Sequence, residues 1–293
     1  MSLKTELSRI ASDIEIVLDE MIPQTPLENS PENVSRYAIM DAGKRLRSFL
    51  TVASANLFGD HYNCALRAGA CLEMIHNFSL IHDDLPCIDN DDLRRGKPSV
   101  WAKYGERNAV LAGDFLLNHA FVTLSRDEKI SSDPAVRIEL IKILSQMTGG
   151  MIIGEWLDCE AETKPNQNES EITQIQNLKT GCLFNAATSM GAILGGATAE
   201  QRNALKTFTD AFGLCFQITD DVLDVTGDQE LVGKTLNKDT AAGKATFVSI
   251  MGVDGARAKV LELGRVAKDA LSIFDERADV LRELMDYVVD RRS

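Results

Sequence analysis

Residues 166–293 contain no proline, although seven prolines occur earlier in the chain. Proline removes a backbone donor and breaks helices, so this stretch permits long uninterrupted helices. Apolar residues recur at spacings of three and four, as in Leu7–Met21, Ile138–Met147 and Val280–Val288. The alternation that is typical of strands is hard to find. We therefore predict an all-α fold, a single bundle of roughly ten or more helices.

Composition limits the class of protein. Apolar residues make up 44% and charged residues 26% of the 293 residues, which is ordinary for a globular chain, and we expect one domain over residues 1–293. The net charge of −13 argues against binding to nucleic acid or to anionic lipid. The uncharged stretch Thr180–Ala199 contains four glycines and several polar residues. We interpret it as a buried helix and not as a membrane span.

Cysteines and the N-terminus suggest a cytoplasmic protein. The six cysteines form no C-x-x-C pair, and no histidine lies near one at zinc-finger spacing. We interpret them as reduced thiols. Met1–Pro23 carries charges throughout and has no apolar core of a signal peptide.

Two aspartate clusters carry the strongest chemical signal. Residues 83–92 contain five aspartates, and Asp220, Asp221 and Asp224 form a D-D-x-x-D motif. Asp220 and Asp224 share one face if the segment is helical. An apolar run precedes each cluster, so we expect each cluster near one end of a core-facing helix.

Aspartates this close repel one another. Two unit charges ~5 Å apart cost ~3 kcal/mol at an effective dielectric constant of ~20. A cation that prefers oxygen ligands would offset this cost, and Mg²⁺ is the usual choice where a phosphate completes its shell. The alternative is a solvated acidic helix end.

Basic residues adjoin glycines at several points. Each could be an ordinary surface cation, but together with the aspartates they predict sites for more than one diphosphate. The segments are Gly43–Arg47, Arg94–Lys97, Lys179–Gly181, Gly233–Lys234 and Gly243–Lys244.

These motifs resemble those of the trans (E-type) short-chain prenyl diphosphate synthases, most closely the bacterial farnesyl diphosphate synthases. The resemblance runs from Gly43 to Phe247 and rests above all on Ser79–Pro86, Asp91–Pro98 and Phe216–Asp224. It implies a helical bundle around a deep apolar cavity, the isoprenoid synthase type, and a homodimer for which Val110–Leu124 could form the interface.

The resemblance also implies a reaction. Isopentenyl diphosphate would condense head to tail with dimethylallyl or geranyl diphosphate by ionisation, condensation and elimination, giving farnesyl diphosphate with fifteen carbons. Three Mg²⁺, or Mn²⁺ instead, would bridge the aspartate motifs and the allylic diphosphate. The implied metal ligands are Asp83, Asp84, Asp89, Asp220 and Asp224, of which Asp84 is the weakest candidate.

The remaining site residues follow from the same resemblance. Thr180 and Gln217 would flank the reacting carbons and act in catalysis with Lys179, Asp83, Asp89 and Asp220. The isopentenyl diphosphate ligands would be Lys44, Arg47, His76 and Arg95. The allylic diphosphate ligands would be Arg94, Lys179, Lys234 and Lys244.

Chain length is expected to depend on Phe78 and Ser79. Phe78 lies five residues before Asp83, ~7.5 Å along a helix, where its ring could form the floor of the product tunnel. The alternative is an ordinary core aromatic. Products of twenty or ten carbons, geranylgeranyl or geranyl diphosphate, remain alternatives.

Two other protein classes compete with this interpretation. A terpene cyclase shares the ionisation chemistry but usually lacks the Lys44, Arg47 and His76 pocket. A non-catalytic synthase subunit tends to lose the aspartate motifs, and both motifs are present in this chain. Glu155, Gln176 and Val248 depart from the family pattern, where Gln, His and Pro are common.

Overall fold

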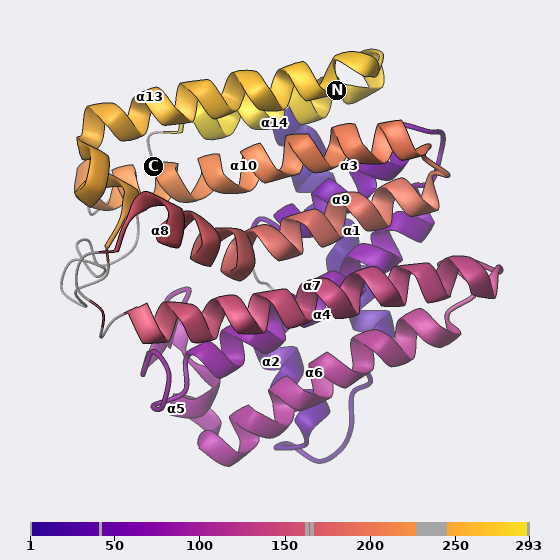
Figure 1. Ribbon diagram of the computed structural model, residues 1–293. Helices are drawn as coiled ribbons and strands as arrows, with labels where there is room; N and C mark the ends of the chain where they lie inside the picture. Colours follow the sequence, from indigo (N-terminus) through magenta and orange to yellow (C-terminus); the bar gives the residue numbers. More distant parts are fainter. Residues whose placement is uncertain (1, 41–42, 162–163, 165–166, 227–244, 292–293) are drawn as a thin grey trace. The chain divides into compact units, whose positions relative to one another are not determined.

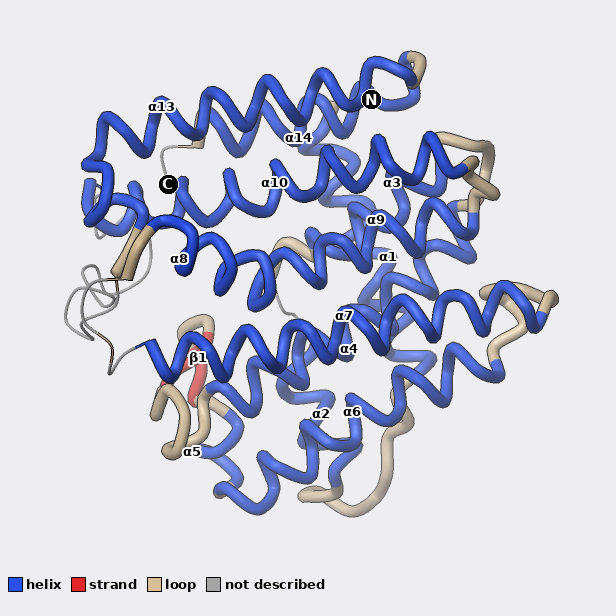
Figure 2. Tube along the Cα trace, viewed as in Figure 1, coloured by secondary structure: helices blue, strands red, loops and turns tan. Residues whose placement is uncertain are grey.

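The computed structural model describes residues 2–40, 43–161, 164, 167–226 and 245–291, which are almost entirely helical, as predicted (Figure 2). Contacts divide the chain into two compact units. Unit 1 comprises Met1–Ser145 and Ser189–Ala197, and unit 2 comprises Gln146–Thr188 and Thr198–Ser293. Two helices, α7 (Pro134–Ala161) and α9 (Cys182–Leu194), contribute residues to both units.

Unit 1 is built around one buried helix, α4. Its helices are α1 (Leu3–Met21), α2 (Pro31–Ile39), α3 (Leu46–Asn56), α4 (Tyr62–Asp83), α5 (Val100–Tyr104) and α6 (Glu106–Arg126). Helices α1, α2, α3 and α6 all pack against α4. Small residues permit the close contacts, since a Cβ built on Gly69 would lie 3.0 Å from the Ser48 Cα of α3. The amphipathic helix α1 buries Ile10, Ile14 and Leu18.

A short hairpin, which the helical pattern of the sequence does not predict, follows the end of α4. Strands β1 (Leu93–Arg94) and β2 (Lys97–Pro98) pair antiparallel. Arg95 and Gly96 connect them with φ of 53° and 75°. Positive φ at both central residues is the geometry of the tight turn that suits the twist of a hairpin. Strands of two residues leave no alternating pattern for a sequence to reveal.

Unit 2 contains three long helices that lie side by side, α10 (Ala199–Thr226), α13 (Phe247–Ala270) and α14 (Asp279–Val289) (Figure 1). Helix α8 (Glu169–Gln176) continues directly into a π-helical turn, η1 (Asn177–Gly181). Two 3-10 turns, η2 (Leu271–Ile273) and η3 (Glu276–Ala278), connect α13 to α14. Gly252, with φ 72° and ψ 168°, interrupts the helical backbone of α13.

The uncharged stretch predicted as a buried helix forms the end of η1 and all of α9, and most of its apolar side chains are buried. No helix in the described part of the chain is long and apolar enough to cross a membrane. Two of the basic segments, Gly233–Lys234 and Gly243–Lys244, lie outside the described residues.

Candidate active site

The first aspartate cluster begins at the C-terminal end of α4, as predicted. The backbone then turns back on itself, because the Asp89 N–H donates to the Asp83 carbonyl at 2.8 Å and the Asp91 N–H to the Asp84 carbonyl at 3.1 Å. Asn90 accommodates the turn with φ 52°. The fold thus brings Asp83 and Asp89 to neighbouring positions. The negative end of the helix dipole disfavours these carboxylates, so the position calls for a cation.

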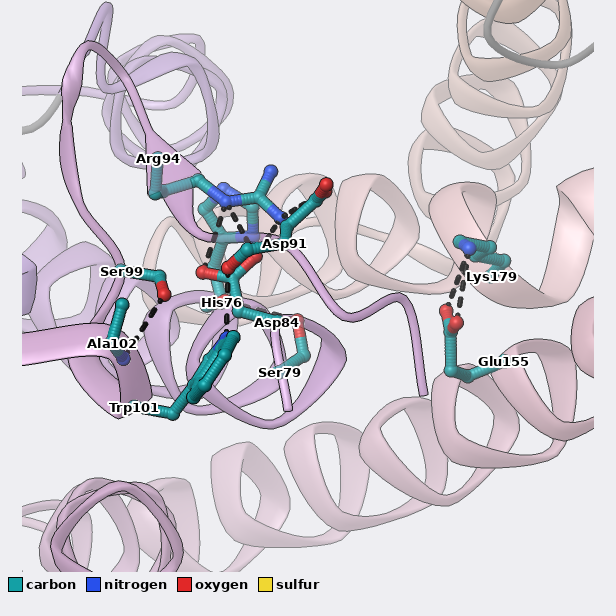
Figure 3. A network of polar contacts seen from close by, with 10 residues as sticks. All are labelled: His76, Ser79, Asp84, Asp91, Arg94, Ser99, Trp101, Ala102, Glu155 and Lys179. Carbon is teal, nitrogen blue, oxygen red and sulfur yellow. Dashed lines mark hydrogen bonds and ion pairs between the residues drawn. The ribbon is translucent and has the colours of Figure 1, made fainter. Parts of the chain in front are cut away.

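Asp84 already has a cationic partner in Arg94 of β1 (Figure 3). The Arg94 Nε donates to the Asp84 carboxylate at 3.0 Å, and its Nη2 makes a second, shorter bond. Asp84 is only 2% exposed. Burial raises the pKa of Asp84, while Arg94 opposes that shift. Asp84 therefore holds the hairpin onto α4, a role that the sequence pattern did not indicate.

Backbone contacts fix the rest of the loop. The indole N–H of Trp101 in α5 donates to the Asp91 carbonyl at 2.8 Å, and the Ser99 N–H donates to the Asp92 carbonyl at 2.8 Å. The Ser99 side chain caps α5 (Figure 3). Sequence reasoning missed Trp101, because a single tryptophan outside any motif carries no such signal.

Three residues predicted to bind isopentenyl diphosphate come together in unit 1. A Cβ on Gly43 would lie 3.5 Å from the Arg95 guanidinium carbon, so the Gly43–Arg47 turn lies against Arg95. Burial lowers the pKa of Arg47 to about 10, with Glu73 opposing the shift and Arg95 adding to it. Burial, then Arg47 and Arg95, hold the pKa of His76 well below its usual range. Arg47, His76 and Arg95 thus form one cluster, in which two guanidinium groups act on the histidine.

Lys44, the fourth predicted ligand, is exposed in the same turn. A pocket of unit 1 lies beside this cluster. Arg94, Arg95 and Lys97 line it together with Asn77, Tyr37 and Asp84. Its cations suit an anionic ligand.

A buried ion cluster supports the Gly43–Arg47 turn. Arg45 adopts the left-handed conformation with φ 50°, and its side chain is fully buried. Its guanidinium bonds Glu73 of α4 at 3.1 Å, Glu15 of α1 and the Ile39 carbonyl. Glu73 also accepts from the Ser48 hydroxyl at 3.3 Å. Glu73 lies one helical turn before His76, so Arg45 fixes the turn close to that histidine. The sequence analysis assigned no role to Arg45 or Glu73.

In unit 2, Asp220 and Asp224 lie four residues apart near the C-terminal end of α10, as predicted. The Asp220 carboxylate accepts from Arg291 Nη1 at 2.7 Å. The Asp221 carboxylate accepts from the Phe247 N–H at 2.9 Å at the start of α13. Asp221 therefore has a structural contact, in keeping with its omission from the predicted ligands.

Lys179 lies in the π-helical turn η1, and Thr180 follows it. Single π-helical turns are frequent at functional sites. The Lys179 ammonium contacts Glu155 of α7 at 2.8 Å (Figure 3). It also contacts Asp158 of the same helix at 2.7 Å. Burial opposes the charge of the ammonium, but the two carboxylates outweigh it and raise the pKa of Lys179.

The other predicted catalytic residue of unit 2 is Gln217 on α10. Its amide nitrogen donates to the Gln176 side-chain oxygen at the end of α8. Gln176 is one of the departures from the family pattern, and its amide forms a neutral hydrogen bond there.

Phe78 and Ser79, the predicted chain-length residues, lie on α4. Phe78 is buried, and its ring contacts the His82 ring edge to face at 5.1 Å between centroids. The Ser79 hydroxyl donates to the His76 carbonyl at 3.0 Å. Gly113 of α6 makes room for this packing, since a Cβ there would lie 2.2 Å from His82 Nε2.

The donor set fits magnesium bound jointly with a diphosphate. The predicted ligands are all carboxylates, the hard oxygen donors that Mg²⁺ prefers. In the described residues, no three acidic, thiol or imidazole side chains are grouped as a ready-made metal site. Mg²⁺ is usually held by one or two carboxylates plus substrate phosphates, which needs no such cage.

Comparison with known proteins agrees with this geometry. A family model described as polyprenyl synthetase matches residues 28–283. The apo crystal structure of an FPP/GFPP synthase from Zymomonas mobilis superimposes with a TM-score of 0.88 at 42% identity, over 98% of both chains. The farnesyl diphosphate synthase of Escherichia coli K12 is 36% identical over 300 residues, covering 100% of both proteins. A chloroplastic geranylgeranyl pyrophosphate synthase of Catharanthus roseus is 40% identical over 260 residues, covering 87% of this chain and 72% of that protein.

Proposed function

The chain belongs to the polyprenyl synthetase family and is a short-chain prenyltransferase, and on that premise we propose that it makes farnesyl diphosphate from isopentenyl diphosphate and dimethylallyl or geranyl diphosphate. The observation that carries the site assignment is the cluster of Arg47, His76 and Arg95 beside the aspartates that end α4. A family member needs such a second diphosphate site, which a terpene cyclase does not.

The proposed roles of the side chains follow from their chemistry. Arg47 and Arg95 bind the diphosphate of isopentenyl diphosphate, with exposed Lys44 beside them. His76, whose lowered pKa keeps it neutral, donates a hydrogen bond without adding charge. Holding this substrate in one orientation makes attack on the allylic carbon effectively unimolecular.

The allylic diphosphate is proposed to bind Arg94 and Lys179, and also Lys234 and Lys244. These cations stabilise the negative charge that develops on the departing diphosphate. The proposed metal ligands are Asp83, Asp89, Asp220 and Asp224, with Asp84 as the weakest member. Bound magnesium would supply further positive charge at the leaving group. Thr180 and Gln217 are proposed to flank the reacting carbons.

The fifteen-carbon product is supported by Phe78, a buried ring on the helix that ends at Asp83. The competing product is geranylgeranyl diphosphate, because a relative that makes it is as similar to this chain as the farnesyl synthase is. Phe78→Ala should lengthen the product if the ring is the floor of the tunnel. An unchanged product distribution would place the floor elsewhere.

The first experiment is to incubate the purified chain with isopentenyl and dimethylallyl diphosphates and Mg²⁺ and to size the products by mass spectrometry. A fifteen-carbon product supports the proposal, and a twenty-carbon product keeps the enzyme class but overturns the tunnel argument. Asp83→Ala and Asp220→Ala should reduce kcat by orders of magnitude. A near-normal rate in either variant would contradict the ligand assignment.

We also propose that residues 1–293 act as one synthase domain in a cytoplasmic homodimer. The six cysteines are free, which suits a reducing compartment. Val110 and Leu111 are exposed apolar side chains of α6, in the helix suggested for the interface.

A further inference from the structure

Lys179 is held by two carboxylates at once. Its ammonium lies 2.7 Å from Asp158 Oδ2 and 2.8 Å from Glu155 Oε2. It also donates to the other carboxylate oxygen of Glu155, Oε1, at 3.1 Å. Two carboxylates thus share this one ammonium. An ammonium has three donors, and this arrangement engages at least two of them. A diphosphate that approaches Lys179 therefore competes with both carboxylates for the ammonium.

The backbone holds Lys179 close to these carboxylates. A Cβ built on Gly154 would lie 2.2 Å from the Lys179 nitrogen and 2.6 Å from the Leu178 carbonyl carbon. Helix α7 and the turn η1 are thus in direct backbone contact, next to Glu155 in the sequence. This contact keeps the side chains of Lys179 and Glu155 within reach of each other.

We propose that Glu155 is a positioning residue that sets the affinity for the allylic diphosphate by competing with it for the Lys179 ammonium. This inference rests on the proposed role of Lys179 as a diphosphate ligand. Glu155 is the partner suited to this role, because Asp158 is the more buried of the two and keeps Lys179 in place when Glu155 is neutralised. With Glu155 neutral, Lys179 would keep one carboxylate partner in Asp158 and lose its ion pair with residue 155.

The test compares Glu155→Gln, which removes the charge and keeps the shape, with the wild type in steady-state kinetics for each substrate in turn. We expect the KM for dimethylallyl diphosphate to fall by about 3- to 10-fold, as expected for a screened charge near the surface. The KM for isopentenyl diphosphate should stay unchanged. Glu160→Gln is the matched control, because Glu160 is an exposed glutamate on the same helix.

Three results would overturn the inference. One is an unchanged or raised allylic KM in Glu155→Gln, and another is a similar fall in Glu160→Gln, which would indicate a general charge effect. The third is a calorimetric titration with inorganic pyrophosphate and Mg²⁺ in which both Glu155→Gln and Lys179→Met bind pyrophosphate as the wild type does.

This titration needs no turnover. We expect Glu155→Gln to bind pyrophosphate more tightly and Lys179→Met to bind it more weakly, and wild-type affinity in both variants would contradict the role of Lys179 as a diphosphate ligand. Absence of condensation in the wild type would contradict the proposed function, and the titration would still test Glu155.

Discussion

Arg45 supports the cationic side of the site although it lies among acidic residues and not in a ligand position. Its side chain is fully buried and bonds two glutamates and a carbonyl. A buried charge is tolerated only when it is paired and hydrogen-bonded. The Lys44 and Arg47 positions on either side therefore depend on Glu73, which lies one turn from His76 on α4.

Glu73→Gln tests this dependence. Removing the buried carboxylate charge leaves Arg45 with fewer partners, so we expect the free energy of unfolding to fall by about 2–4 kcal/mol. Urea unfolding measures the change. The control is Glu6→Gln, which breaks the partly exposed pair with Arg9 and should cost less than about 1 kcal/mol. Equal losses in the two variants would contradict the structural role of the buried cluster.

His76 gives the stability a pH dependence whose sign can be stated. Its pKa in the folded chain is held well below the usual value near 6.5 by burial and by Arg47 and Arg95. As the pH falls below about 6.5, His76 takes up a proton in the unfolded chain but stays neutral in the folded chain, so acid favours unfolding. This contribution reaches at most about 1.4 kcal/mol per pH unit. Urea unfolding between pH 5 and 8 should show a steeper loss in acid for the wild type than for His76→Asn, and identical slopes would refute it.

Single elements differ in how well the sequence anticipates them. The helices of residues 7–21, 138–147 and 280–288 were expected from apolar periodicity, and α1, α7 and α14 confirm them. The hairpin at Arg95 and the π-helical turn at Lys179 were not expected. The hairpin depends on two residues with positive φ, and the π turn is only five residues long between two α-helices, so neither leaves a hydrophobic pattern of its own.

Gly154 is the position where element packing is most sensitive. Gly154→Ala would place a methyl carbon 2.2 Å from the Lys179 nitrogen, so we expect α7 and η1 to separate, with a loss of about 1–3 kcal/mol or more and of most activity. Gly149→Ala is the control on the same helix, since nothing lies within 4 Å of its built Cβ. That variant should be neutral or gain up to about 1 kcal/mol. Thermal unfolding compares them, and equal stability of the two variants would contradict the close approach.

At the scale of the whole molecule, helical periodicity predicted the all-α class, and the motifs predicted the family and the enzyme class, which the structure and the comparisons confirm. Arg47, His76 and Arg95 lie together in unit 1, while the expected group of Arg94, Lys179, Lys234 and Lys244 stays a prediction. The roles of Asp84, Arg45 and Glu155 could not be predicted, because they depend on which long-range partner a charged side chain meets. That information lies in tertiary packing and not in spacing along the chain.

Metal removal should separate function from folding. The core of both units is apolar, so the helices should not need magnesium to form. We expect EDTA to abolish condensation while the far-ultraviolet circular dichroism and the thermal midpoint stay within error, and added Mg²⁺ should restore turnover. A large loss of helix in EDTA would instead indicate a structural metal.

The break at Gly252 divides α13 into two parts with different local stability. A helix of five residues, 247–251, is too short to persist alone, so its order depends on the buried Phe247 ring and on the bond from the Phe247 amide to Asp221. In hydrogen exchange, these amides should open independently of those after Gly252 and exchange faster. A ligand held by the neighbouring Asp220 should slow them. Slower hydrogen exchange in residues 247–251, but not after Gly252, would then show that a ligand is bound at Asp220.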